Sequence, residues 1–120
     1  MSGFRLADRV RSFGPALRGI RAMLRDEHNA RIHAVATGVV VVLGLGFGLE
    51  RGEWLAIVVA TALVWVAEAF NSAVEALGDV LSSEAHPLVG RAKDVAAGGV
   101  LLAAIGALVV AALVFGPRVL

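Results

Sequence analysis

Three long apolar runs dominate the chain, and its polar residues are confined to the stretches between them. The runs cover residues 32–49, 54–80 and 95–115. Each reaches or exceeds about 18 residues, the length that a helix rising about 1.5 Å per residue needs to cross roughly 30 Å of hydrocarbon. The pattern predicts an all-α integral membrane protein: one domain over residues 1–120, with three transmembrane helices.

Residues 1–28 follow a different pattern, with apolar side chains every three or four positions and arginines between them. The apolar positions are Leu6, Val10, Phe13, Leu17, Ile20 and Leu24. This spacing predicts an amphipathic helix in the membrane interface, its guanidinium groups among lipid phosphates. Gly14-Pro15 should break it in two, because proline removes a helical donor and crowds the preceding turn. The alternative is an arginine-rich flank that only orients the protein.

Composition supports a membrane protein and limits the chemistry that is available. Hydrophobic residues make up 58% of the chain and the mean hydropathy is +0.82. There is no cysteine, so neither disulfides nor thiolate metal sites can form. The sequence has no glycine-rich phosphate loop and no pair of histidines at metal-binding spacing. A nucleotide site would therefore have to be built from helix faces, and no nucleic-acid partner is expected.

The arginines predict how the chain is oriented. Seven of them precede the first apolar run, and only one lies in the 50–53 turn. By the positive-inside rule, the N-terminus and the 80–94 loop face the cytoplasm, whereas the 50–53 turn and the C-terminus lie outside. The expected location is the inner (cytoplasmic) membrane, with several passes.

The stretch "VAEAFNSAVEALGD", residues 66–79, places polar side chains inside the second apolar run. Glu68, Asn71, Glu75 and Asp79 follow one another at steps of three and four. At about 100° per residue they share an arc of roughly 80° on one helix face. An ionised carboxylate in hydrocarbon costs several kcal/mol, so such residues normally face protein or water and are functional. A polar seam that joins helices is the alternative.

Depth separates these residues into two groups. Glu68 lies two turns, about 10 Å, deeper than Glu75. Beyond Glu68 the helix offers only Thr61, so the polar stripe predicts a pocket open to one side rather than a route across the membrane. Glu75, with Glu27, could bind Mg²⁺ through carboxylate oxygens. Glu68 could take a proton from a substrate hydroxyl at membrane depth. Alternatively, Glu27 and Arg31 form an exposed helical ion pair.

The segment "SSEAHPLVGRAKDVAAGG", residues 82–99, carries the only lysine of the chain, Lys93. Asp94 follows it and could cap a helix whose free N–H groups favour phosphate, with Lys93 as a phosphate clamp. The alternative is a cytoplasmic anchor followed by an ordinary helix cap. Small residues crowd the third run and allow close helix packing. Because three helices enclose a polar pocket poorly, we expect a homo-oligomer whose site is shared between subunits.

The motifs "EAFNSAVEALGD" and "SSEAHPLVGRAKD" resemble those of the small prokaryotic diacylglycerol kinase and undecaprenol kinase family. The resemblance extends from "ALRGIRAMLRDEHNARIH" to the last apolar run. It implies a homotrimer with a surface helix and three transmembrane helices per subunit. It also implies transfer of the γ-phosphate of ATP, with Mg²⁺, to a lipid hydroxyl.

The resemblance also implies residue roles. Glu68 matches the catalytic base, and Glu27 and Glu75 match the Mg²⁺ ligands. Arg21 and Arg31 match basic positions near the lipid, together with Glu68 itself. The positions expected around the nucleotide are Asn71, Asp79, Glu84, His86, Lys93 and Asp94.

Three departures from the family pattern bear on the substrates. Ala85 stands where many relatives have an aromatic residue, and Pro15 where they often have a tyrosine near the adenine. Ala96-Ala97 replaces the Gly-Ser of the diacylglycerol-specific branch. The undecaprenol kinase branch is closer, so undecaprenol is the first expected substrate and diacylglycerol the second. A proton or cation conductor and a non-catalytic membrane assembly protein are the competing functions.

Overall fold

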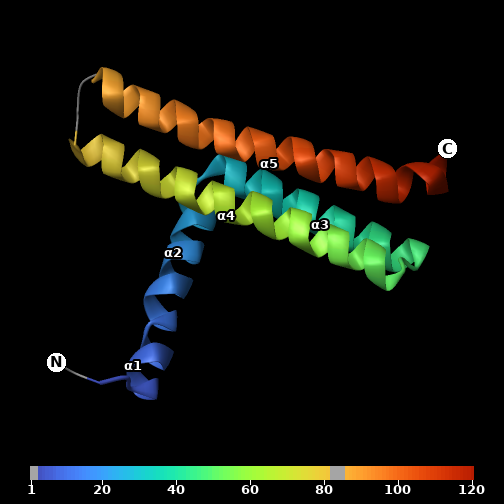
Figure 1. Cartoon of the computed structure of the whole chain (residues 1–120), viewed down its shortest axis with the longest axis horizontal. Helices are drawn as coiled ribbons and strands as arrows, with labels where there is room; N and C mark the ends of the chain where they lie inside the picture. The colour runs from blue at the N-terminus through green and yellow to red at the C-terminus, as the bar shows by residue number, and fades with distance from the viewer. Residues whose placement is uncertain (1–2, 82–85) are drawn as a thin grey trace.

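The computed structural model describes residues 3–81 and 86–120, and its regular structure there is entirely α-helical. The helices, in chain order, are α1 (Leu6–Arg11), α2 (Phe13–Asp26), α3 (His28–Phe47), α4 (Arg51–Leu81) and α5 (Pro87–Val119). In Figure 1, α3, α4 and α5 lie side by side, and the α1–α2 arm projects away from them. The predicted all-α class is confirmed.

Each of α3, α4 and α5 is long and apolar enough to cross a membrane. The 20 residues of α3 extend about 30 Å, which matches the hydrocarbon thickness. The 31 residues of α4 and 33 of α5 extend about 46 and 50 Å, so both continue beyond it. At most 22% of the most apolar window of each helix is buried within the chain. The remaining apolar surface is left for lipid or other protein.

Each predicted span corresponds to one of these long apolar helices, but the helix boundaries differ from the predicted ones. Helix α5 begins at Pro87 rather than near residue 95, and α4 begins at Arg51 rather than at 54. The turn before α4 is therefore shorter than the predicted 50–53 turn. It starts at Gly48, whose φ of 67° is left-handed and whose N–H donates to the Gly44 carbonyl at 3.0 Å. Glycine adopts this conformation without steric cost and commonly ends helices.

The N-terminal arm is divided into two helices, but the break lies at Ser12 and not at Gly14-Pro15. Pro15 is the third residue of α2. In the first turn of a helix the backbone N–H groups have no intrahelical acceptor, so proline removes nothing there. The predicted position of the break was wrong because this proline begins a helix rather than interrupting one.

Close packing joins the last turns of α4 to the first turns of α5. Gly78 of α4 is buried. A Cβ atom built on it would lie 2.7 Å from Cε of Lys93 and 3.1 Å from Cγ1 of Val89. The missing side chain of Gly78 therefore makes room for Lys93 to lie across α4.

Candidate active site

Glu68 is the one charged residue that the described part of the chain buries completely, at 0% exposure. It comes from the second half of α4, where helical periodicity points it toward α3. The ring Nε2 of His33, from the second turn of α3, lies 3.4 Å from its Oε2 atom. The two groups are at ion-pair distance without hydrogen-bond alignment. Among residues 3–81 and 86–120, neither Glu68 oxygen therefore has a hydrogen-bond donor.

His33 was missed by the sequence reasoning, and its surroundings are well defined. Its ring meets that of Trp65 edge to face, with ring centroids 6.3 Å apart and an interplanar angle of 66°. Trp65 Nε1 donates to the hydroxyl of Thr37 at 3.0 Å, and that hydroxyl donates to the His33 carbonyl at 2.7 Å. The signal was present in the sequence: a titratable side chain inside an apolar run is the same observation that pointed to Glu68.

The residues next to Glu68 on α4 also carry unpartnered polar atoms. Oδ1 of Asn71 and Oγ of Ser72 are buried and have no hydrogen-bond partner within the described residues. Leaving such a group unpaired costs roughly 1–3 kcal/mol. Buried polar atoms are normally satisfied, so exceptions call for an explanation such as a ligand or an ion. These atoms concentrate in one stretch of α4, which makes it the candidate binding site.

Glu75 lies about one helical turn beyond Ser72 on α4, and Asp79 about two turns beyond it. Both carboxylates contact Lys93 of α5. The Lys93 Nζ atom is 2.6 Å from Oδ1 of Asp79 and 3.5 Å from Oε2 of Glu75. The Asp79 and Glu75 side chains are 71% and 42% exposed, whereas that of Lys93 is 27% exposed. The structure therefore brings these three predicted residues together in a cluster that solvent can reach.

The other loop residues are placed differently from the prediction. Asp94 does not cap a helix: it is exposed, well inside α5. His86 is the N-cap instead, and its Nδ1 accepts a hydrogen bond from the backbone N–H of Leu88 at 3.2 Å. The helix starts earlier than expected because Pro87 is suited to its first position. Glu84 lies outside the described residues.

Glu27 stands at the elbow between α2 and α3, where its backbone is extended (φ −109°, ψ 120°). Its side chain makes no capping hydrogen bond. A crevice of about 440 Å³ separates α2 from α4 here, and its walls include Glu27, Ser72, Ala73 and Ala76. The elbow thus places Glu27 on a crevice shared with Ser72, Ala73 and Ala76 of α4, and Glu75 is not among its walls.

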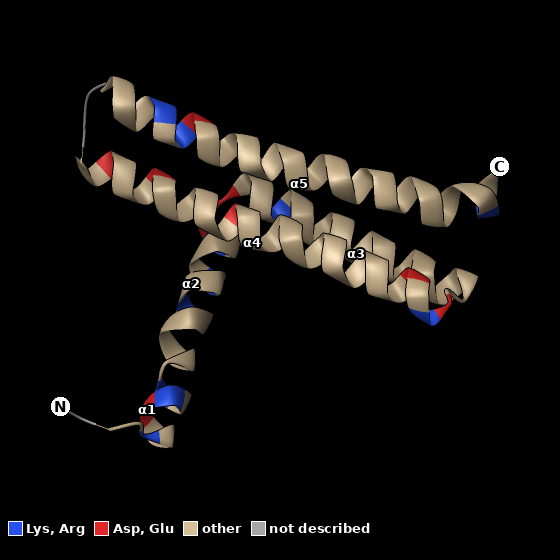
Figure 2. Cartoon of the chain, in the orientation of Figure 1, with Lys and Arg blue, Asp and Glu red and all other residues tan. Residues whose placement is uncertain are grey.

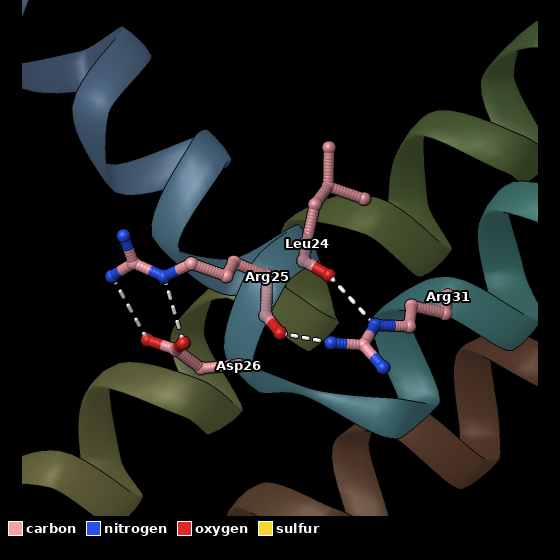
Figure 3. A network of polar contacts seen from close by, with 4 residues as sticks. All are labelled: Leu24, Arg25, Asp26 and Arg31. Atoms are coloured by element: carbon pink, nitrogen blue, oxygen red, sulfur yellow. Dashed lines mark hydrogen bonds and ion pairs between the residues drawn. The ribbon is translucent and has the colours of Figure 1, made fainter.

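The guanidinium of Arg31 closes the elbow, which Figure 3 shows from close by. It donates to the carbonyl of Leu24 at 3.1 Å and also to that of Arg25, so it satisfies free carbonyls at the end of α2. Arg31 is therefore not in the predicted helical ion pair with Glu27. Arg25 bonds Asp26 at 2.9 Å, and this hydrogen bond holds the pKa of the Asp26 carboxyl below its usual range.

Most charged residues lie on the N-terminal arm and near the ends of the long helices. In Figure 2 charged residues lie along the α1–α2 arm and at the ends of the long helices, and acidic segments also appear midway along α4. Arg21, one of the predicted lipid-side residues, is exposed on α2. The polar cluster of α4 and α5 thus belongs to one end of the bundle, and Glu68 lies between it and the apolar centre.

A magnesium site is compatible with these residues, although one chain does not assemble a complete set of ligands. Within residues 3–81 and 86–120, no three His, Asp or Glu side chains gather so that they could hold a metal ion. Mg²⁺ commonly takes only one or two protein carboxylates and completes its octahedron with water and substrate phosphates. Glu27 and Glu75 carry the carboxylate chemistry for that role, but no contact in the described residues joins them.

Comparison with known proteins identifies the class of protein to which this membrane-embedded acidic site belongs. The family model described as "Prokaryotic diacylglycerol kinase" matches residues 14–115. The undecaprenol kinase of Bacillus subtilis (strain 168) is 34% identical over 108 residues, which cover 90% of this chain and 88% of that protein. The diacylglycerol kinase of Escherichia coli (strain K12) is 33% identical over 100 residues, 83% of this chain and 82% of that protein.

The chain therefore belongs to the prokaryotic diacylglycerol kinase family. It is a lipid kinase, a phosphotransferase with an alcohol as its acceptor. This membership confirms the predicted family and decides for the enzyme over the conductor and the non-catalytic assembly protein.

Proposed function

We propose that this protein transfers the γ-phosphate of ATP, with Mg²⁺, to the hydroxyl of undecaprenol, and that diacylglycerol is its second-best acceptor. The observation that carries the proposal is the fully buried carboxylate of Glu68, which lies on α4 between its apolar half and the Lys93 cluster. A lipid hydroxyl reaches that depth from the membrane, whereas a nucleotide reaches the cluster from water.

In this reaction Glu68 acts as the general base. Its carboxylate accepts the proton of the lipid hydroxyl while the hydroxyl oxygen forms a bond to the γ-phosphorus. The bond from that phosphorus to the bridging oxygen of ADP breaks, and ADP leaves with the electron pair. Phosphoryl transfer requires mainly positioning and charge neutralisation from the protein. The free carboxylate oxygens of Glu68 support this role, because no donor of the described chain occupies them.

The remaining predicted residues divide between the metal and the nucleotide. Glu27 and Glu75 would hold Mg²⁺, which when bound would neutralise charge on the phosphates. Lys93 would bind phosphate oxygens as a point charge. The predicted nucleotide contacts are Asn71, Asp79, Glu84, His86, Lys93 and Asp94, of which Glu84 remains a prediction from the sequence alone.

The proposed arrangement in the membrane places the N-terminus and residues 80–94 in the cytoplasm, where ATP is available. The α1–α2 arm would lie in the interface, since its apolar residues Leu6, Phe13 and Leu17 are 64–70% exposed. Arg21 would meet lipid phosphates from there. Three copies would assemble with shared sites, supported by the extensive exposed apolar surface of the long helices and the partial exposure of Glu75.

Two observations support undecaprenol as the preferred lipid. The Bacillus undecaprenol kinase matches 90% of this chain, against 83% for the Escherichia diacylglycerol kinase, at similar identity. In addition, Ala96-Ala97 departs from the Gly-Ser of the diacylglycerol-specific branch.

The test is label transfer from γ-labelled ATP to undecaprenol and to diacylglycerol, offered side by side in mixed micelles with Mg²⁺ and then with a chelator. We expect labelled undecaprenyl phosphate as the main product, less phosphatidic acid, and no product once the metal is removed. A higher kcat/KM for diacylglycerol would overturn the choice of lipid. The absence of label in both lipids would overturn the proposed function as a whole.

A further inference from the structure

We propose that His33 is a positioning residue for Glu68, and that it holds the carboxylate ready for the lipid hydroxyl. This inference rests on the proposed function, which makes Glu68 the base. Among the described residues, Glu68 is within ion-pair distance of His33, whose Nε2 atom lies 3.4 Å from Oε2 of the carboxylate. The Glu68 side chain has a flexible stem, so a base at this position needs a partner that selects one orientation.

The distance itself fits a pair that tightens when substrate binds. A hydrogen bond from a ring nitrogen to a carboxylate oxygen is normally about 2.7–2.9 Å long. Catalytic hydrogen bonds are often longer without substrate and shorten in the productive complex. When the pair tightens and the Nε2 N–H donates to Oε2, the second oxygen, Oε1, is left for the lipid hydroxyl. A donor at this point also reduces the cost of keeping a buried carboxylate ionised.

The ring of His33 is itself held in place from two helices. The edge-to-face contact with Trp65 of α4 restricts its tilt. Trp65 is fixed in turn by its bond to Thr37, one helical turn beyond His33 on α3. An active group oriented by a second residue, which is oriented by a third, is a common arrangement in catalytic sites. Here the arrangement couples α3 to α4 at the depth of the base.

The first test compares His33→Ala and His33→Gln with the wild type by steady-state kinetics. The glutamine amide keeps an N–H donor of similar reach, whereas alanine keeps none. We expect His33→Ala to lower kcat roughly tenfold to a hundredfold, the usual effect of losing an outer-shell partner, with an unchanged KM for ATP. His33→Gln should recover most of the loss. Wild-type kcat in His33→Ala, or equal losses in both variants, would overturn the role of His33.

His28→Gln is the matched control, because His28 is an exposed histidine at the start of the same helix. It should leave kcat unchanged. An active wild-type enzyme whose His33→Ala variant is equally active would contradict only this inference, whereas an inactive wild type would contradict the proposed function.

A second measurement does not depend on activity. The chain has three histidines, so their ring ¹⁵N signals can be assigned by single substitutions in labelled protein. Glu68→Gln should shift the ring signals of His33 and leave those of His28 and His86 in place. Unmoved His33 signals would show that its ring does not sense the carboxylate, and the proposal would be wrong.

Discussion

The ammonium group of Lys93 lies 2.6 Å from the carboxylate of Asp79, and 3.5 Å from that of Glu75 on the same side of α4. The only lysine of the chain is therefore held between two acidic side chains, across the junction of α4 and α5. A nucleotide phosphate that bound there would compete with these carboxylates for the ammonium group. A divalent metal ion on the carboxylates would lower that competition, which links metal binding to nucleotide binding.

Replacing Lys93 by methionine should weaken nucleotide binding, because the variant keeps the length of the side chain and loses its charge. We expect the KM for ATP to rise roughly tenfold or more, the usual scale for losing a charge-assisted contact to phosphate. The KM for the lipid should change little. Arg91→Gln, an exposed cation on the same helix, is the control and should behave as wild type. A Lys93→Met enzyme with normal ATP kinetics would remove this lysine from the nucleotide site.

Gly78→Ala tests whether the close approach of α4 and α5 positions Lys93. The new Cβ would fall 2.7 Å from Cε of Lys93, so the flexible lysine side chain must move away from its carboxylates. We expect a raised KM for ATP with folding retained. Gly90→Ala on α5 meets no atom within 4 Å and should leave the kinetics unchanged, since alanine favours the helix. Identical ATP kinetics in the two variants would argue against the positioning of Lys93 by this contact.

Glu75→Gln should shift the magnesium dependence of the reaction. Removing one of two proposed metal ligands raises the Mg²⁺ concentration needed for half-maximal activity, and an excess of metal should restore part of the rate. A magnesium titration at fixed ATP measures this directly. Glu50→Gln, at the opposite end of α4, serves as the control. If the midpoint for Glu75→Gln equalled that of the wild type, Glu75 would not be a metal ligand.

Local features of the site followed from the sequence, and contacts between helices did not. The spacing of Glu68, Glu75 and Asp79 alone placed them on one face of a helix, because a periodicity of 3.6 residues determines it. The contact with His33 depends on how α3 packs against α4, which no spacing within either helix reveals. The pairing of Lys93 with Asp79 likewise depends on the glycine at 78, which lets the two helices approach.

The predicted helix ends were wrong where a residue type, such as proline, can either begin a helix or interrupt one. Proline at 15 was interpreted as a break, but like Pro87 it stands in the first turn of a helix, where its missing N–H costs nothing. Asp94 was expected to cap a helix that in fact starts at Pro87. The alternative ion pair of Arg31 with Glu27 does not form, because free carbonyls at the end of α2 bind the Arg31 guanidinium.

At the other end of the bundle, Glu53 and Arg118 should matter for stability and not for catalysis. Two nitrogens of the Arg118 guanidinium lie 2.6 and 2.7 Å from the two Glu53 oxygens, so α4 and α5 are joined by a bidentate pair. Glu53→Gln should lower the thermal unfolding temperature in detergent, while kcat and both KM values stay unchanged. Arg118→Lys, which cannot form the bidentate pair, should show the same effect. A change of KM in either variant would contradict a purely structural role.

The central claim is that Glu68 removes the proton from the lipid hydroxyl. Its most direct test is Glu68→Gln, an isosteric change that abolishes the base and leaves the shape of the site intact. Label transfer to undecaprenol and equilibrium binding of Mg²⁺-ATP would be measured on the same preparation. We predict that transfer falls by at least about a hundredfold, at the low end of the effect of a general base, while the dissociation constant for the nucleotide stays within about threefold of the wild-type value. Transfer at the wild-type rate would contradict the account.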